Sequence, residues 1–162
     1  MIRPRYTVPI SVYADTSVFG GMFDEEFAMA TREFFRQVKR GRFKLMTSAV
    51  VRSEITGAPR RVQDFFEETL KLATVAETTA DALRLQQAYM KAEILTPRSA
   101  ADALHVALAT VSGCALIVSW NFQHIVHFQR IPRYNAINKL HGYGELGIYS
   151  PREVIADENQ DI

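Results

Sequence analysis

Short apolar runs alternate along this chain with longer segments whose apolar residues recur every three or four positions. The short runs predict β-strands over residues 8–14, 43–46, 73–76, 115–120 and 147–149. The longer segments predict helices over residues 27–38, 50–55, 61–71, 79–93, 99–113 and 134–140. Strands separated by helices predict an α/β fold, a doubly wound sandwich around a central, mainly parallel sheet of four to five strands.

Length and composition fit one compact domain over residues 1–162, because 48% of the residues are hydrophobic and can fill a sizeable core. The single cysteine, Cys114, cannot form an internal disulfide. No apolar segment long enough for a signal peptide or a membrane span follows the opening residues Met1 to Arg5. We therefore expect a cytoplasmic protein without a membrane partner.

The charge of the chain is nearly balanced, with 19 basic and 18 acidic residues and a formal net charge of +1. Such a chain has no global field that would attract a polyanion. A nucleic-acid substrate would need local basic patches or a second subunit. Candidate basic residues are Arg32, Arg36, Lys39, Arg40, Arg42, Lys44, Arg60 and Arg61. Solvated helix faces explain these residues equally well.

Four polar residues lie at or just beyond the predicted strands or inside the helix that follows: Asp15, Glu54, Asp102 and Asn121. The carboxyl ends of parallel strands open on one crevice, where such folds bind ligands, so these side chains should converge. Clustered carboxylates repel one another, and a hard divalent cation is the usual remedy. The pattern therefore predicts a Mg²⁺ or Mn²⁺ site for phosphate chemistry.

Each of these residues also has a purely structural interpretation. Asp15 and Asn121 are common turn formers. Asp102 could complete a capping box with Ser99 at the start of its helix, which would not prevent that helix end from receiving a phosphate. A carboxylate on an apolar helix stripe, such as Glu54 beside Val50 and Val51, is paired, bound to metal or at the edge of the stripe.

Other polar residues near these strand ends are Thr16, Ser17, Ser119 and His124. The three hydroxyls can donate to a phosphate or to the acids, or can simply cap the backbone. Gly20 and Gly21 would allow the backbone to approach a ligand closely. His124 suits a structural or a substrate-contacting role equally, and we interpret His105 as a histidine packed on a helix face.

Several other chemistries lack their motifs. The chain contains no GxxxxGK[ST], so the nucleotide-binding P-loop is not indicated. The GxSxG motif of serine hydrolases is absent as well. No set of cysteines and histidines has zinc-finger spacing.

Four segments together resemble the ordered acidic motifs of PIN-domain ribonucleases, particularly the VapC-like toxins of type II toxin–antitoxin pairs. The segments are YADTSVFGG, SAVVRSEI, SAADALHVALA and LIVSWNFQHIV. The resemblance implies a sheet in the order 3-2-1-4-5. It matches Asp15, Glu54 and Asp102 to the three family acids and Asn121 to the fourth site. It further implies RNA cleavage with Mg²⁺ or Mn²⁺, a homodimer and a small antitoxin partner.

This chain departs from the family pattern at the fourth site, where Asn121 stands and where some members have aspartate and others asparagine. Ala115 and His124 stand where many relatives carry acids. We expect Asp15 and Asp102 to bind the main ion directly and Glu54 to bind it through water or to position the attacking water. Asn121 would orient water or substrate, and these departures weigh against a second ion more than the first. The alternative is a catalytically inactive PIN-like module that binds RNA or protein.

Overall fold

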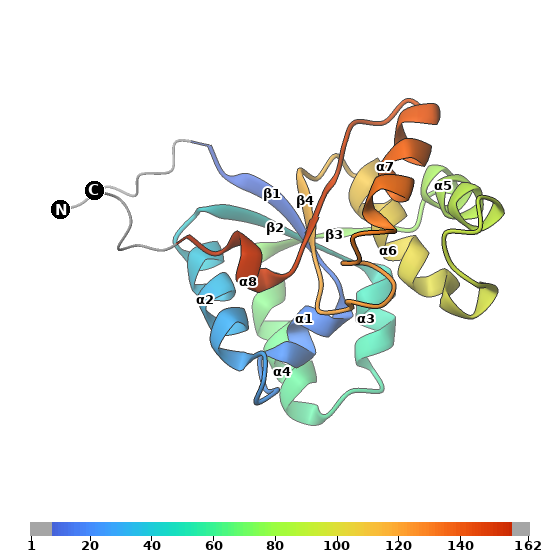
Figure 1. Ribbon diagram of the computed structural model, residues 1–162. Coiled ribbons are helices and arrows are strands. Elements are labelled where there is room, and N and C mark those ends of the chain that lie inside the picture. The colour runs from blue at the N-terminus through green and yellow to red at the C-terminus, as the bar shows by residue number, and fades with distance from the viewer. Residues whose placement is uncertain (1–7, 157–162) are drawn as a thin grey trace.

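The computed structural model describes residues 8–156 of the chain, which form an α/β sandwich around one sheet (Figure 1). The sheet is entirely parallel and has the order β3-β2-β1-β4-β5. Its strands are β1 (Ile10–Ala14), β2 (Phe43–Ser48), β3 (Ala73–Ala76), β4 (Leu116–Val118) and β5 (Gly147–Tyr149). The predicted fold class and the strand order implied by the family resemblance are both confirmed.

Helices connect and cover the strands. They are α1 (Thr16–Gly21), α2 (Ala28–Lys39), α3 (Ala49–Ile55), α4 (Arg60–Thr69), α5 (Ala80–Lys91), α6 (Ala100–Val111), α7 (Ile131–Leu140) and α8 (Pro151–Val154). Two short 3₁₀ helices are η1 (Leu70–Leu72) and η2 (Pro97–Ser99). The chain moves from β1 to β3 in one direction and then returns through β4 to β5. Right-handed crossovers therefore place α1 to α4 and α5 to α7 on opposite faces of the sheet.

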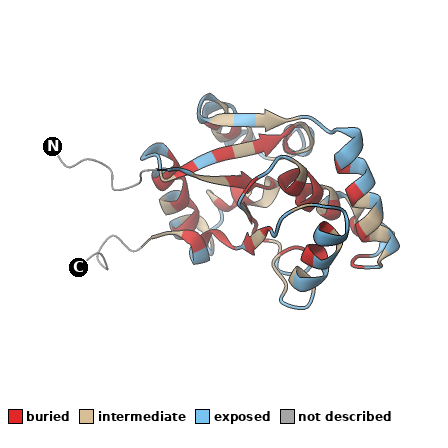
Figure 2. Ribbon diagram, turned by 90° about the horizontal axis from the view of Figure 1, so that it is seen from above, coloured by how far each residue is buried: buried red, intermediate tan, exposed pale blue. Residues whose placement is uncertain are grey.

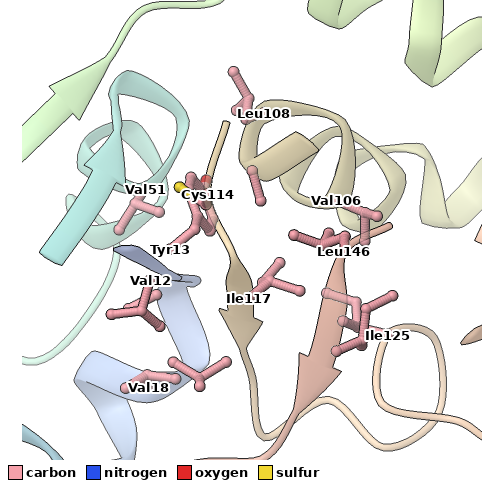
Figure 3. Packing of buried hydrophobic residues seen from close by; sticks show 14 of the residues in the cluster. Val12, Tyr13, Val18, Val51, Val106, Leu108, Cys114, Ile117, Ile125 and Leu146 are labelled. Atoms are coloured by element: carbon pink, nitrogen blue, oxygen red, sulfur yellow. The ribbon is translucent and has the colours of Figure 1, made fainter. Parts of the chain in front are cut away.

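The hydrophobic core lies between the sheet and both helix layers. Central strands of a parallel sheet are buried on both faces, and accordingly Val12, Tyr13 and Ala14 of β1 are fully buried. Figure 2 shows buried residues on the strands and on the sides of the helices that face them. Figure 3 shows side chains of several elements in this core, among them Val51 of α3 and Ile117 of β4.

Two helices that the sequence pattern did not predict are α1 and α8. The first follows β1 directly, and Val18 and Phe19, which are fully buried there, hold it against the core. The second begins at Pro151, two residues after the end of β5. Proline suits the first turn of a helix, and Ser150 and Glu153 form a capping box around it.

The Gly20–Gly21 pair, expected to let the backbone approach a ligand closely, also has a packing role. A Cβ atom on Gly21 would lie 2.6 Å from Trp120 Nε1, so this glycine makes room for an indole ring of the protein itself. Gly20 would meet nothing within 4 Å. Within residues 8–156 no helix is long and apolar enough to cross a membrane. The opening residues Met1 to Arg5, on which the expectation about signal peptides depends, lie outside the described residues.

Candidate active site

The candidate site lies at the carboxyl edge of the sheet, where β1 and β4 end side by side. Ala14 pairs with Val118 as the last residue of each strand. Asp15 follows the first and Ser119 follows the second, and the backbone N–H of Asp15 donates to the carbonyl of Val118. Helices α3 and α6 bring Glu54 and Asp102 to the same edge, as the contacts below show.

Asp15 is buried, with 4% of its surface exposed, and both of its carboxylate oxygens accept hydrogen bonds. Ser17 Oγ donates to Oδ1 and Ser119 Oγ donates to Oδ2, each over 2.6 Å. Burial raises the pKa of the Asp15 carboxyl above its usual value, although the charge of His105 and the two serine hydroxyls act in the opposite direction. The site thus holds an acid whose ionised form the folded protein stabilises incompletely.

The two serines are themselves fixed by the backbone that follows β4. The N–H of Trp120 donates to Ser17 Oγ over 2.9 Å, and the N–H of Asn121 donates to Ser119 Oγ over 2.9 Å. With their oxygens accepting these bonds, the hydroxyl protons remain available for Asp15. Ser17 and Ser119, predicted as phosphate or acid contacts, therefore hold the carboxylate in this structure.

Glu54 lies on α3 with 40% of its side chain exposed. Its Oε1 atom accepts a hydrogen bond of 2.6 Å from His105 Nε2 and one of 3.2 Å from Thr16 Oγ1. Burial raises the pKa of the Glu54 carboxyl, but the hydrogen bond and charge of His105 outweigh it and leave the pKa below the usual value. Glu54 is therefore ionised at neutral pH.

His105 has 3% of its side chain exposed and is the unexpected member of the site. Its Nδ1 atom lies 2.7 Å from the hydroxyl of Tyr13, which lies 2.8 Å from Ser48 Oγ. Burial lowers the pKa of His105, but the neighbouring carboxylates, above all Glu54, raise it further and leave it above the usual value. The interpretation of His105 as a packed histidine is therefore incomplete, because the ring links two polar side chains, Tyr13 and Glu54.

Asp102 is in the first turn of α6, and its Oδ2 atom lies 2.9 Å from His124 Nδ1. Ser99, the residue before the helix, makes no side-chain cap bond, and its Oγ atom lies 3.4 Å from His124 Nε2. The capping box that the sequence suggested at Ser99 and Asp102 is therefore not formed. Both residues face His124 instead.

Asn121 has the turn-forming geometry that the sequence left open. Its Oδ1 atom accepts from the backbone N–H of Gln123 over 3.2 Å and from that of His124 over 2.9 Å. The amide oxygen of Asn121 is thus engaged by its own loop. By closing this turn, Asn121 fixes the segment that carries His124 to Asp102.

The donor set suits a hard cation, because it consists of carboxylates with hydroxyls around them. In residues 8–156 no group of three or more His, Cys, Asp or Glu side chains is arranged to hold a metal ion by itself. Mg²⁺ commonly keeps several waters and is bound by one or two carboxylates together with substrate phosphates. The residues present fit that kind of open site and do not form a closed cage.

Comparison with known proteins adds the family. The family model of the PIN domain matches residues 12–125, which include all four residues that predicted the site. No curated protein matches the chain. The fold is similar to a chain in the crystal structure of VapBC2 from Rickettsia felis bound to a DNA fragment from their promoter. The TM-score is 0.56 at 12% identity, over 76% of this chain and 94% of that one. Since the family model spans well over half of its residues, this chain belongs to the PIN domain family.

Proposed function

We propose that this protein is a metal-dependent ribonuclease that hydrolyses phosphodiester bonds of RNA. The observation that carries the proposal is the position of Asp15, Glu54 and Asp102, which come from three parts of the chain and lie at one sheet edge of a PIN domain. PIN domains are nucleases, so family membership supports hydrolysis of a phosphodiester. RNA as the substrate is our inference from the resemblance to PIN-domain ribonucleases, and Mg²⁺ or Mn²⁺ as the cofactor is our inference from the acids.

The three acids would have different roles in catalysis. Asp15 and Asp102 would hold the ion, and Glu54 would hold or orient a water on it. When bound, a divalent ion lowers the pKa of its water and offsets charge on the scissile phosphate. Ser17 and Ser119 keep the Asp15 carboxylate in one orientation. A positive charge beside Asp15 would also remove the penalty that burial places on its ionised form.

The toxin of a toxin–antitoxin pair is the biological setting that we propose. The neighbouring structure contains VapBC2 bound to promoter DNA. In this chain a groove of about 550 Å³ between α2 and the α4–η1 segment has Phe35 and Phe65 among its apolar residues. Arg32 and Lys39 add exposed positive charge. Such a groove suits an amphipathic, acidic segment of a small antitoxin.

The antitoxin proposal is tested with the product of the neighbouring gene. We expect it to co-purify with this protein and to inhibit cleavage. Reversing the charge of Arg32 and Lys39 together should weaken the complex, whereas Lys91→Glu on α5 should not. An inhibitor that binds equally well after charge reversal would place the antitoxin elsewhere on the surface.

The decisive experiment for the enzymatic proposal is incubation of the purified protein with labelled RNA and Mn²⁺. Wild-type protein should cleave the RNA, and EDTA should prevent cleavage. Asp15→Asn should lower the rate at least about a hundredfold, as loss of one positioned catalytic group commonly does. The matched control is Asp64→Asn on α4, whose side chain is 66% exposed and pairs with Arg60.

A non-catalytic binding module is the second candidate, and one observation favours it. Each of the three acids already has a hydrogen-bond partner within the protein. If the wild type binds RNA but cleaves none of it with either metal, this module is the better description. Cleavage at the same rate by wild type and Asp15→Asn would point to a contaminating nuclease.

A further inference from the structure

We propose that His105, Tyr13 and Ser48 form a buried hydrogen-bonded chain that positions the Glu54 carboxylate. His105 is then a positioning residue, because it acts through Glu54 and not on the substrate. The inference deepens the proposed function, on which it rests for the catalytic meaning of Glu54. Its structural content, that the chain sets the orientation of Glu54, stands on geometry alone.

The hydrogen-bonded chain joins four elements that are far apart in the sequence. It runs from Ser48 at the end of β2 to Tyr13 on β1, then to His105 on α6 and finally to Glu54 on α3. The three contacts measure 2.8, 2.7 and 2.6 Å. Both ring nitrogens of His105 are engaged, so the imidazole cannot turn without losing a bond. The direction in which Nε2 reaches Glu54 is fixed in this way.

The inner end of the chain is anchored to the backbone. The N–H of Val51 donates to Ser48 Oγ over 3.2 Å, as the N-cap bond of α3. Helix α3 is also the helix that carries Glu54. Ser48 therefore ties the start of α3 to Tyr13, while His105 ties a side chain near its end. The two connections fix where the helix presents its acid.

Burial along the chain shows which member can meet a ligand. Ser48 and Tyr13 are fully buried and the His105 side chain is 3% exposed, whereas the Glu54 side chain is 40% exposed. A buried polar side chain costs stability unless it is hydrogen-bonded, so an apolar core would be the simpler way to fill this space. Retaining three polar groups that end on one exposed carboxylate is the arrangement expected of a preorganised site.

Through Tyr13, the hydrogen-bonded chain also relates the position of Glu54 to that of Asp15. Residues two apart on an extended backbone point to the same side, and Asp15 is still extended, with φ −78° and ψ 178°. Tyr13 on β1 and Asp15 directly after it thus project toward the same side of the sheet. One short segment, β1 and the residue after it, therefore supplies the acid Asp15 and also Tyr13, which supports Glu54 through His105. This fixes the two carboxylates relative to each other before any ligand arrives.

The first test measures position without metal. Tyr13→Phe removes only the hydroxyl, and NMR of protein with ¹³C-labelled glutamate carboxyl and ¹⁵N-labelled histidine reports on Glu54 and His105. We expect both sets of signals to shift in Tyr13→Phe. In the control, Tyr89→Phe, which removes another buried hydroxyl bonded to Asn138, they should stay unchanged. An unchanged Glu54 carboxyl signal in Tyr13→Phe would overturn the proposal. Ser48→Ala serves the same purpose if Tyr13→Phe does not fold.

The second test measures how the loss of the Tyr13 hydroxyl changes the affinity for Mn²⁺, by titration calorimetry. Tyr13→Phe should weaken Mn²⁺ binding at least about tenfold, as removal of supporting residues around metal ligands does, whereas Tyr89→Phe should not. In a Glu54→Gln background the same change should have no further effect. An equal loss in both backgrounds would show that Tyr13 acts on another group. If wild-type protein binds no Mn²⁺, the metal part of the proposed function fails, and the NMR result still decides the positioning.

Discussion

Ser119 Oγ donates a hydrogen bond of 2.6 Å to Asp15 Oδ2 across the ends of β4 and β1, although the two residues are 104 positions apart. Ser17 serves the other oxygen of the same carboxylate. Both direct partners are neutral hydroxyls, and the burial of Asp15 raises its pKa. Ionised Asp15 is therefore a cost to the folded protein in the absence of a cation.

Replacing Asp15 with asparagine should stabilise the protein in EDTA at pH 7. The folded-state pKa of Asp15 lies above the usual value of 3.8. Between these two pKa values the folded state holds the carboxyl proton more often than the unfolded state does. The contribution of Asp15 to the stability of the wild type therefore falls as pH rises through this window. Asp15→Asn should melt about 2–4 °C higher at pH 7, equivalent to about 1 kcal/mol in a domain of this size.

Thermal unfolding measured from pH 4 to pH 7 checks this prediction. The difference between the two proteins should shrink as the pH falls toward 4, because the wild-type carboxyl is increasingly protonated there. Asp64→Asn should follow the wild type at every pH, because that acid is exposed. A lower melting temperature for Asp15→Asn at pH 7 would contradict the argument.

Divalent metal should raise the melting temperature of the wild type, because the ion binds only the assembled site. At a concentration one hundred times Kd the gain is about 2.7 kcal/mol. Asp15→Asn should lose this shift, and Glu68→Gln, an exposed acid beside Lys71, should keep it. Absence of binding and of stabilisation by millimolar Mg²⁺ and Mn²⁺, even with RNA present, would refute the metal site.

Gly21→Ala should destabilise the protein by about 1–3 kcal/mol, the usual cost of overpacking a filled core. The new Cβ would lie 2.6 Å from Trp120 Nε1 and 2.9 Å from Thr31 Oγ1, two atoms that are hydrogen-bonded to each other. Denaturant titration provides the measurement. Gly20→Ala is the matched control, since its Cβ meets nothing and alanine favours a helix by about 0.5–1 kcal/mol.

RNA binding to Asp102→Asn, a variant that we expect not to cleave RNA, should weaken steeply with salt. The expected slope is about −0.7 in log K per log salt for each phosphate neutralised on a single strand. A chain of net charge +1 reaches such a slope most simply as a homodimer that pools basic residues of two subunits. Light scattering should then give the mass of a dimer. A flat salt dependence, or a strict monomer that binds RNA tightly, would favour recognition by a protein partner.

The hydrophobic pattern predicted the sheet well, because burial between two helix layers leaves a clear signal. Strands β3 and β5 have their predicted limits. Strand β4 was expected over residues 115–120 but ends at Val118. The N–H of Trp120 donates to a side chain, Ser17 Oγ, and not to a strand. The pattern of apolar residues contains no information about such a bond.

The partners of the acids could not be predicted in the same way. Spacing placed Asp102 and His105 on one helix face, yet each bonds to a residue from elsewhere, His124 and Glu54. These pairs depend on how helices α3 and α6 and the loop after β4 are packed. A capping box does form elsewhere, between Ser150 and Glu153. The hydrophobic pattern did not predict it, because it did not predict the short helix that begins at Pro151.

Trp120 lies directly after Ser119 and is the single tryptophan of the chain. Its ring stacks on Phe27 at 4.2 Å, donates to Thr31 Oγ1 and lies beneath the guanidinium of Arg152. When tryptophan is excited selectively, the intrinsic fluorescence of the protein therefore comes from one place, beside the carboxyl edge of the sheet where the acids lie. Binding of an ion, an RNA or a protein there can be followed optically without any label.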